Sequence, residues 1–374
     1  MTDEPALRRL IDRVLTARDT RTPLRLRGHG SKDFYGETPR GETLDMTALA
    51  GITHYEPTEL VVTARAGTPL AELEAVLAAQ GQCLPFEPPR LQAEGDGTGA
   101  RAAPRNGTVG GMVAAGLAGP ARAAVGGVRD FVLGAALLDA TGEVLRFGGE
   151  VMKNVAGYDI ARVLAGSLGI LGPIVEVSLK VLPVPPARAT LRLECDQARA
   201  LQQLQQWAGQ PLPLRASAWW NDMLVVQLAG AEAAVKAAVH GMGGERIETA
   251  AADQFWSGLR DQRDEFFLGA QQAVHGGATL WRLSVASTTP PLALDGEQLI
   301  EWGGALRWAV NRSDAATMRA LAAQHGGHAT EYRGAKRAGV FTPLSAPLAR
   351  IHRELKTRFD RDHLFNPGRL YPDL

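Results

Sequence analysis

The sequence predicts an α+β fold with two main domains. Its 374 residues suffice for roughly two domains of about 150 residues each. Helical patterns alternate with strands at hairpin spacing, which favours antiparallel sheets over a parallel βαβ arrangement. Glycine-rich loops gather in the first half of the chain, whereas all 7 tryptophans lie in the second half. This change of composition, together with the stiff segment PVPPA at 183–187, predicts a boundary near residue 186.

The first domain, predicted over residues 1–186, begins with a helix and continues into strands. Residues 5–18, PALRRLIDRVLTAR, are rich in arginine, but their interspersed acids and helical spacing predict a solvated helix face. Short β-rich runs predict strands at 23–27 and 59–66. A hairpin is predicted over 131–148, with its two strands joined by an Asp-Ala-Thr-Gly turn.

A second helix is predicted in TPLAELEAVLAAQG, residues 68–81. Thr68 is expected to cap its N-terminus, Pro69 to occupy the first helical position and Gly81 to end it. In the second half, strands and helices alternate with short connections, and DQFWSGLRDQRDEFF, residues 253–267, predicts one helix.

Composition excludes several classes of function. The 40 basic and 40 acidic residues balance, so bulk charge does not indicate a nucleic-acid partner. Cys83 and Cys195 cannot supply the four thiolates of an iron–sulfur cluster, and we expect them to be free thiols. No apolar run reaches membrane-spanning length, and we expect no N-terminal signal sequence. We therefore expect a cytoplasmic protein that meets the inner face of the membrane only through partners.

The first glycine-rich loop lies in RLRGHGSKDFYG, residues 25–36, directly after a predicted strand. A dinucleotide-binding fingerprint requires GxGxxG leading into a helix, but Asp33 occupies the third glycine position and Pro39 follows. Two interpretations remain. The loop is either a nest of backbone amides that binds an anion, to which Arg27 and Lys32 add charge, or an ordinary glycine-rich turn.

Two further glycine-rich loops follow. NGTVGGMVAAGLAG, residues 106–119, combines glycines with small side chains, which allow a ring or a phosphate to approach the backbone, or two elements to pack tightly. GSLGILG, residues 166–172, holds three glycines within seven residues ahead of a predicted strand. That density suggests that some group comes very close to the backbone. Three such loops separated by strands are better explained by one extended ligand that contacts all of them than by three unrelated causes.

With these segments in view, the chain resembles the vanillyl-alcohol oxidase, or PCMH-type, FAD-binding family. The motifs RGHGS, GTVGGMVAAGLAG, GGVRDFVLGAALLDATGEVLRFGG and LAGSLGILGPIVEVSLKVLP occur in the family's order over residues 23–186, and FDRDHLFNPGRLYPDL resembles its closing segment. The resemblance implies a PCMH-type FAD-binding domain of two α+β subdomains over 1–186. It also implies a smaller α+β cap domain with an antiparallel sheet over 187–345, and a C-terminal helix and tail, 346–374, that pack on the FAD domain.

The resemblance also implies a set of FAD-binding residues. They are Arg27, Gly28, His29, Gly30, Ser31 and Lys32 in the first loop, Gly107, Thr108, Gly110 and Gly111 in the second, Ser167, Gly169, Gly172, Ile174 and Val175 in or after the third, and Asn366 in the tail. His29 raises the question of a covalent flavin link. Family members with that link usually carry the histidine at the place of Ser31, so we expect non-covalent FAD.

Catalytic residues are harder to assign. Lys153 and Tyr158 precede the third loop, where they could face the flavin or simply lead into the following helix. Relatives that oxidise 2-hydroxy acids carry GDGNxH and a later EHG in the second domain. GDGNxH is absent here. The segment AQHGGH matches the later EHG motif only in part, through His325, and can equally form a solvent-facing turn. Arg369 could meet a substrate carboxylate or hold the tail in place. We expect no metal site.

Within the family, RGHGSKDFYG, MKNVAGYDIARVLAGSLG and FNPGRLYPD are most similar to the E-type, FAD-binding subunits of bacterial glycolate oxidases. This similarity implies a flavoprotein that takes part in oxidising glycolate to glyoxylate. The implied partners are a second flavin-binding, D-type subunit and an iron–sulfur subunit. The alternatives are a flavin-bound relay or assembly subunit, and a stand-alone dehydrogenase for another 2-hydroxy acid.

Overall fold

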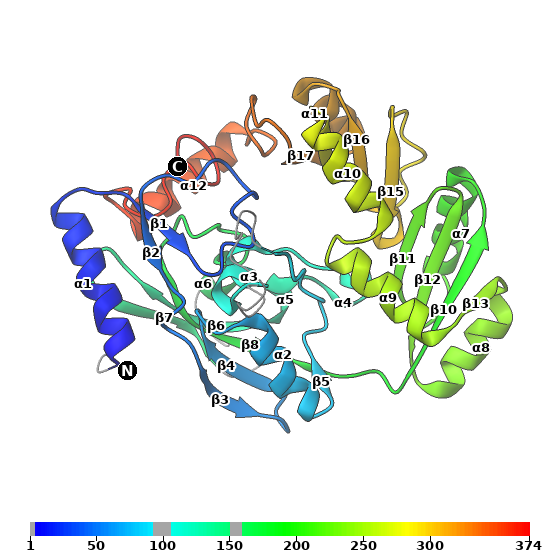
Figure 1. Ribbon diagram of the computed structural model, residues 1–374, viewed down its shortest axis with the longest axis horizontal. Helices are drawn as coiled ribbons and strands as arrows, with labels where there is room; N and C mark the ends of the chain where they lie inside the picture. Colours follow the sequence, from blue (N-terminus) through cyan, green and yellow to red (C-terminus); the bar gives the residue numbers. More distant parts are fainter. Residues whose placement is uncertain (1–3, 93–105, 150–158) are drawn as a thin grey trace. The chain divides into compact units, whose positions relative to one another are not determined.

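The computed structural model describes residues 4–92, 106–149 and 159–374 (Figure 1). The chain divides into two compact units. The first comprises the described residues within Met1–Leu117, Gly127–Pro183 and Pro343–Leu374, and the second comprises Ala118–Gly126 and Val184–Thr342. Both units contain helices and antiparallel sheets, so the predicted α+β class is confirmed.

A five-stranded antiparallel sheet forms the centre of the first unit. Its strand order is β3-β4-β8-β6-β7. The strands are β3 (Ile52–Glu56), β4 (Val61–Arg65), β6 (Val132–Leu138), β7 (Val144–Gly148) and β8 (Ile174–Lys180). A parallel pair, β1 (Leu24–Arg27) and β2 (Glu42–Asp45), and a short ribbon, β5 (Gln82–Cys83) and β9 (Leu182–Pro183), lie outside this sheet. The predicted hairpin over 131–148 is confirmed as β6 and β7.

The helices of the first unit are α1 (Pro5–Asp19), α2 (Leu70–Ala79), α3 (Val109–Ala115), α5 (Val128–Phe131), α6 (Ile160–Val163) and α12 (Ala346–Phe359). Helix α2 is present as predicted, but the capping role expected of Thr68 is wrong. Pro69 occupies the N-cap position, and the Thr68 hydroxyl instead accepts from Gly51 N at 2.9 Å and donates to Gly51 O at 3.1 Å. The Thr68 hydroxyl is therefore hydrogen-bonded to a neighbouring loop and does not cap the helix.

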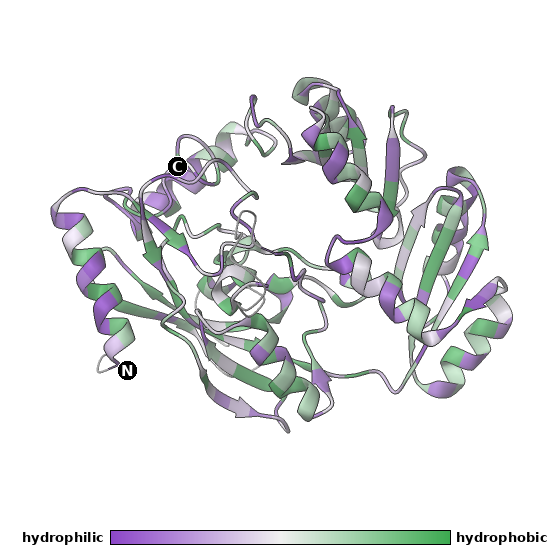
Figure 2. Ribbon diagram, viewed as in Figure 1, coloured by the Kyte–Doolittle hydropathy of each residue, from purple (hydrophilic) through white to green (hydrophobic). Residues whose placement is uncertain are grey.

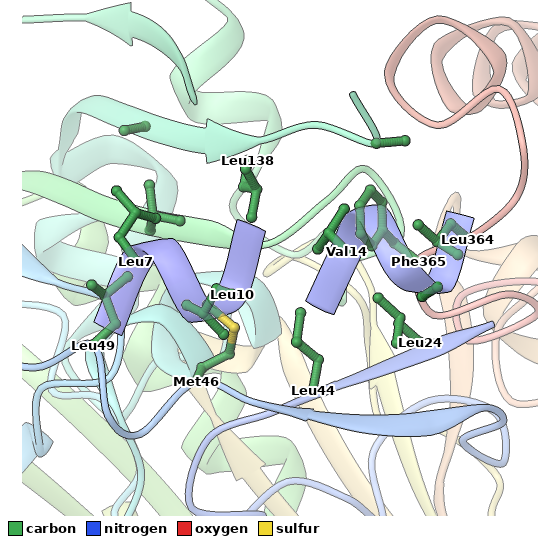
Figure 3. Packing of buried hydrophobic residues seen from close by; sticks show 14 residues of the cluster. Leu7, Leu10, Val14, Leu24, Leu44, Met46, Leu49, Leu138, Leu364 and Phe365 are labelled. Carbon is green, nitrogen blue, oxygen red and sulfur yellow. The ribbon is translucent and has the colours of Figure 1, made fainter. Parts of the chain in front are cut away.

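Helix α1 buries one side in a core shared by distant parts of the chain (Figure 3). Leu7, Leu10 and Val14 recur at helical spacing and are buried. They belong to one cluster with Leu24, Leu44, Met46, Leu49, Leu138, Leu364 and Phe365. Fully burying an apolar side chain of this size contributes roughly 1.5–3 kcal/mol. This core therefore holds β1, β2 and the C-terminal tail together, and it positions the loop that follows β1.

An eight-stranded antiparallel sheet forms the second unit, in the order β13-β10-β12-β11-β15-β16-β14-β17. The strands are β10 (Ala187–Glu194), β11 (Leu214–Trp220), β12 (Met223–Gly230), β13 (Glu245–Ile247), β14 (Thr279–Ser284), β15 (Glu297–Glu301), β16 (Leu306–Asn311) and β17 (His328–Arg333). The helices are α4 (Arg122–Val125), α7 (Gln197–Ala208), α8 (Glu232–Met242), α9 (Thr249–Arg260), α10 (Glu265–His275), α11 (Ala315–Gln324) and the 3₁₀ turn η1 (Trp302–Gly304). Figure 2 shows hydrophobic residues along β6 and β8 of the five-stranded sheet and along β12 of the eight-stranded sheet.

Two features of the second unit differ from the sequence-based expectation. The single helix predicted over 253–267 is wrong: α9 ends at Arg260 and α10 starts at Glu265. Between them Gln262 has a φ of 55°, and the Asp264 side chain caps α10 by accepting from Phe267 N at 2.9 Å. In addition, residues 118–126 belong to the second unit, because α4 packs on β11 and η1, and Trp302 Nε1 donates to Gly119 O at 3.0 Å.

The C-terminal segment belongs to the first unit, where its helix α12 (Ala346–Phe359) lies. Among the residues that the structure describes, no helix combines the length and the apolar character needed to cross a membrane.

Candidate functional site

One cleft in the first unit collects residues from all three glycine-rich loops and from the C-terminal tail. Of the expected FAD-binding residues, all but two line it: Arg27, Gly28, His29, Gly30, Ser31, Lys32, Gly107, Thr108, Gly110, Gly111, Gly169, Gly172, Ile174 and Asn366. The loops are far apart in the sequence, and the sheet and its flanking core bring them together. We call this cleft the glycine-lined cleft.

Ser167 and Val175 lie outside this lining. The Ser167 hydroxyl accepts from Gly169 N at 3.3 Å, so it bonds within its own loop. Val175 is fully buried in β8, in the core beneath α1, and its carbonyl accepts from Ala66 N at 3.1 Å. Both residues support the wall of the cleft from behind.

The first loop presents backbone amides to the cleft. Gly28 directly follows β1, and Asp33 N donates to Gly30 O at 3.0 Å to form a tight turn. Within the residues that the structure describes, the amides of Gly28, Gly30 and Ser31 donate to no acceptor. Amides of this kind clustered in one turn suit an anion with several oxygens.

Charged side chains around this loop have separate roles. Arg27 Nε donates to Asp33 Oδ2 at 2.8 Å, and Arg25 also pairs with Asp33. The Asp33 carboxylate therefore forms ion pairs with both guanidinium groups. Lys32 Nζ lies 3.4 Å from both Ser31 Oγ and Pro89 O. Lys32 therefore places its ammonium group at the edge of the cleft, between the first loop and residues that follow α2.

The second loop contributes a surface without large side chains, and several of its backbone amides are already hydrogen-bonded within the protein. Thr108 caps α3 by accepting from Gly111 N at 3.2 Å, while Val109 N and Gly110 N donate to Thr68 O and Ala66 O. A Cβ on Gly110 would lie 2.6 Å from that of Ala66, so only glycine permits this contact. The second loop therefore forms a wall that lacks large side chains.

The density of glycines in GSLGILG has an internal cause. Gly169 has a φ of 72°, and a Cβ there would lie 2.9 Å from Asn366 Nδ2 and 3.1 Å from Leu26 Cδ1. At Gly169, the group that comes close to the backbone is the protein's own C-terminal tail. Tight packing and left-handed backbone already favour glycine there, and the expected contact of this loop with a bound ligand stays a prediction.

The C-terminal tail joins two of the cleft loops. Asn366 Oδ1 accepts from Leu26 N at 2.8 Å, and Asn366 Nδ2 donates to Leu168 O at 2.7 Å. Arg369 donates to Lys32 O at 3.1 Å, to Asp33 O at 3.0 Å and to Glu37 O. Both tail residues are buried and line the cleft. The tail therefore acts as a clamp on the first and third loops.

Arg369 is thus occupied by backbone carbonyls, and burial lowers its pKa to about 10. This geometry favours the tail-holding role over contact with a substrate carboxylate. His325 lies elsewhere, at the C-terminal end of α11 in the second unit. Lys153 and Tyr158 fall outside the described residues. Across 4–92, 106–149 and 159–374, no cluster of His, Cys, Asp and Glu side chains could hold a metal ion.

Comparison with known proteins identifies the family. A profile described as "FAD binding domain" matches residues 8–148. The Escherichia coli protein "Glycolate oxidase subunit GlcE" is 46% identical over 365 residues, which cover 98% of this chain and 97% of that protein. This chain belongs to the GlcE family. It is an FAD-dependent oxidoreductase, and the predicted cofactor is confirmed.

More distant relatives match only part of this GlcE-family chain. "Glycolate oxidase subunit GlcD" of Bacillus subtilis is 28% identical over 48% of the chain and 36% of that protein. "D-lactate dehydrogenase" of Anaerostipes hadrus is 31% identical over 40% of the chain and 29% of that protein. A solved alkyldihydroxyacetonephosphate synthase has a TM-score of 0.62 over 96% of the chain and 75% of its own, at 16% identity. The predicted PCMH-type α+β fold is confirmed.

The glycine-lined cleft of this GlcE-family protein fits the diphosphate part of FAD. The amides of Gly28, Gly30 and Ser31 and the ammonium of Lys32 suit phosphate oxygens. Asn106, which precedes the cleft-lining Gly107 but does not itself line the cleft, has a buried Oδ1 with no hydrogen-bond donor in the described part of the chain. A buried polar atom of this kind calls for a ligand or a water molecule. We therefore assign FAD to this cleft as a proposal.

Some cleft residues were not expected from the sequence. Met46, Ala66, Ala114, Ala115 and Pro173 also line the cleft. Met46 follows β2, whose parallel register beside β1 places it next to the first loop. That register depends on the shared core beneath α1, and no local motif indicates it.

Gly28 offers a direct test of the cleft assignment. A Cβ at this position would lie 2.4 Å from Thr108 Oγ1, so Gly28→Ala must push the first and second loops apart. Overpacking of this kind costs about 1–3 kcal/mol. If that strain falls on the FAD-bound form, FAD binding should weaken roughly tenfold or more. Titration of the apoprotein with FAD, followed by quenching of flavin fluorescence, measures the effect.

The matched control is Gly209→Ala. Its Cβ would meet only Gln206 O, at an ordinary 3.7 Å, in the second unit. We expect this variant to bind FAD like the wild type. Equal FAD affinity in Gly28→Ala and the wild type would contradict the assignment.

Proposed function

We propose that this chain is the FAD-carrying subunit of a multi-subunit glycolate oxidase that oxidises glycolate to glyoxylate and passes electrons to an iron–sulfur partner. The observation that carries the proposal is the end-to-end match to Escherichia coli GlcE, at 46% identity over 98% of this chain. The partial similarity to a GlcD subunit and to D-lactate dehydrogenases supports a short 2-hydroxy acid as the substrate.

Oxidation of glycolate requires the protein to hold FAD in place. Converting glycolate to glyoxylate removes two electrons and two protons, because the hydroxyl loses a proton and the carbinol carbon loses a hydride. FAD, when bound, supplies the two-electron acceptor. In the proposed site, Gly28, Gly30, Ser31 and Lys32 hold the diphosphate. The Asn366 and Arg369 clamp keeps the loops of the cleft in register.

An iron–sulfur partner is proposed because the electrons must leave this chain. It has only 2 cysteines, whereas an iron–sulfur cluster is held mostly by four thiolates. A tagged chain expressed in its native host should therefore retain a second flavoprotein and an iron- and sulfide-containing protein. Recovery of the chain alone, with its FAD, would favour a stand-alone dehydrogenase.

The decisive experiment concerns the chain by itself. The purified chain should hold FAD in a 1:1 ratio, and anaerobic glycolate should bleach its flavin absorbance. The missing GDGNxH motif favours a second candidate, a flavin-bound relay subunit whose substrate is oxidised elsewhere in the complex. A fully loaded chain whose flavin glycolate leaves oxidised would support the relay and reject substrate oxidation here. A chain that binds no FAD would reject both.

A further inference from the structure

An arginine in the second unit carries a charge that the described part of the chain does not balance. Arg282 lies on β14 and is half-buried. Its guanidinium group makes neither a hydrogen bond nor an ion pair within the described residues. None of its nitrogen atoms is both buried and unpaired, so the edge of the guanidinium group is accessible from outside the protein.

Two indole rings hold this guanidinium group in place. Its central carbon lies 5.1 Å from the centroid of the Trp302 ring and 5.9 Å from that of Trp308. The register of β14 and β16 sets Arg282 directly opposite Trp308, on the same face of the sheet. Cation–π contacts of this kind contribute about 0.5–2 kcal/mol each.

The indole rings are themselves fixed. Trp308 Nε1 donates to Glu301 Oε2 at 2.7 Å, and its ring packs edge-on against Phe267 and Tyr332, with centroids 5.1 and 4.8 Å away. Trp302 Nε1 donates to Gly119 O at 3.0 Å. Both rings are almost fully buried. The platform beneath Arg282 is therefore rigid, and the position of the cation is set before any ligand arrives.

Within the part of the chain that the structure describes, no acidic side chain forms an ion pair with Arg282. Glu301 is close enough to feel its charge but forms no ion pair with it, and burial raises the pKa of Glu301 to about 8. Its carboxyl group is therefore mostly uncharged at neutral pH. The Asp264 carboxylate is engaged in capping α10. A second guanidinium, that of Arg122 in α4, lies 4.6 Å from the Trp302 ring centroid.

We propose that Arg282 is the binding residue for the carboxylate of a small 2-hydroxy acid, held on the Trp302 and Trp308 platform. A guanidinium stacked on aromatic faces keeps its N–H edge available, and that planar edge matches the two oxygens of a carboxylate. A purely structural role would be served better by an apolar residue of similar size, which needs no counterion. The inference rests on the proposed function and names the group that recognises its substrate.

The test uses the full, FAD-loaded chain under anaerobic conditions. Glycolate binding is followed by tryptophan fluorescence, since Trp302 and Trp308 contact Arg282, and flavin reduction is followed by absorbance. Arg282→Met should raise the glycolate concentration for half-saturation roughly ten- to a hundredfold, the usual range for a lost charge-assisted contact. Arg282→Lys, which keeps the charge and loses the fork, should fall between this variant and the wild type.

Two controls separate recognition from general damage. Arg246→Met removes an exposed arginine of β13 in the same unit and should leave half-saturation unchanged. Ethylene glycol, which lacks the carboxylate, should affect the wild type and Arg282→Met alike. FAD content should be the same in all variants. Should Arg282→Met fail to fold, Arg282→Lys with unaltered half-saturation would overturn the inference.

The outcomes distinguish this inference from the proposed function. Glycolate that binds through Arg282 but leaves the flavin oxidised supports the inference and rejects oxidation by this chain. Glycolate that reduces the flavin of Arg282→Met and of the wild type with equal half-saturation supports oxidation and overturns the inference. Wild-type protein that neither binds glycolate nor is reduced by it rejects both.

Discussion

Replacing Lys356 with methionine should lower the free energy of unfolding of the first unit by about 3–5 kcal/mol, the usual effect of breaking a fully buried ion pair. Lys356 and Asp360 have fully buried side chains joined at 2.6 Å. Lys356 Nζ also donates to Ile170 O at 2.7 Å and to Phe365 O at 2.8 Å. The substitution therefore leaves one carboxylate and two carbonyl groups buried with a lost partner.

The Lys356 pair matters to the cleft because of what it connects. Ile170 belongs to the third loop, and Phe365 precedes Asn366 of the tail clamp. Asp360 in turn accepts from the amides of Leu364 and Phe365 at 2.9 and 2.8 Å. Loss of Lys356 should therefore loosen the clamp and weaken FAD binding along with stability.

All tryptophans lie between residues 207 and 308, within the second unit. In urea, flavin fluorescence therefore reports on the first unit and tryptophan fluorescence on the second. Lys356→Met should shift the flavin-detected transition to lower urea and leave the tryptophan-detected one in place. Arg350→Met is the matched control, because its ion pair with Glu354 has the same i,i+4 spacing in α12 but is exposed. Such pairs contribute at most about 0.5 kcal/mol, and equal shifts in both variants would refute the prediction.

Glu301→Gln should remove a large pH dependence from the stability of the second unit. Burial raises the pKa of Glu301 in the folded protein to about 8, above its ordinary value of 4.5. A raised folded-state pKa favours folding at low pH, and this contribution is lost as the pH rises from about 4.5 to about 8. The slope over that window is up to about 1.4 kcal/mol per pH unit. Glutamine cannot ionise, yet its carbonyl can still accept from Trp308 Nε1.

Urea unfolding detected by tryptophan fluorescence at pH 5, 6, 7 and 8 tests this. The wild type should lose stability steadily across the series, and Glu301→Gln should be distinctly flatter. Asp264, whose pKa burial raises to about 6, adds a smaller dependence at the acidic end in both proteins. Glu297→Gln changes an exposed acid of the same strand and should follow the wild type. If stability depended on pH in the same way in Glu301→Gln and the wild type, the raised pKa of Glu301 would not be the cause of that dependence.

Many, but not all, features of the glycine-lined cleft could be predicted from the sequence. The three loops, the strands before or after them and the tail motif were all predicted, since turn glycines and alternating strands are local patterns. Ser167 and Val175 do not line the cleft, because a hydrogen bond within the loop and the core beneath α1 orient their side chains, and their predicted contact with FAD stays a prediction. Asn366 was expected at the cofactor, but its two hydrogen bonds to separate loops could not be read from the motif.

By itself, the sequence determined an α+β fold with glycine-rich loops and a cysteine-poor chain, because each property depends on neighbouring residues or on composition, while the flavoprotein class was implied by the resemblance of its motifs to a known family. Only the tertiary structure decided that the tail clamps the loops, that Lys356 and Asp360 share a buried site, and that Arg282 rests on two tryptophans with no counterion among the described residues. These features join residues distant in the sequence, and burial sets their energies. Burial is a property of the packed whole that no local pattern records.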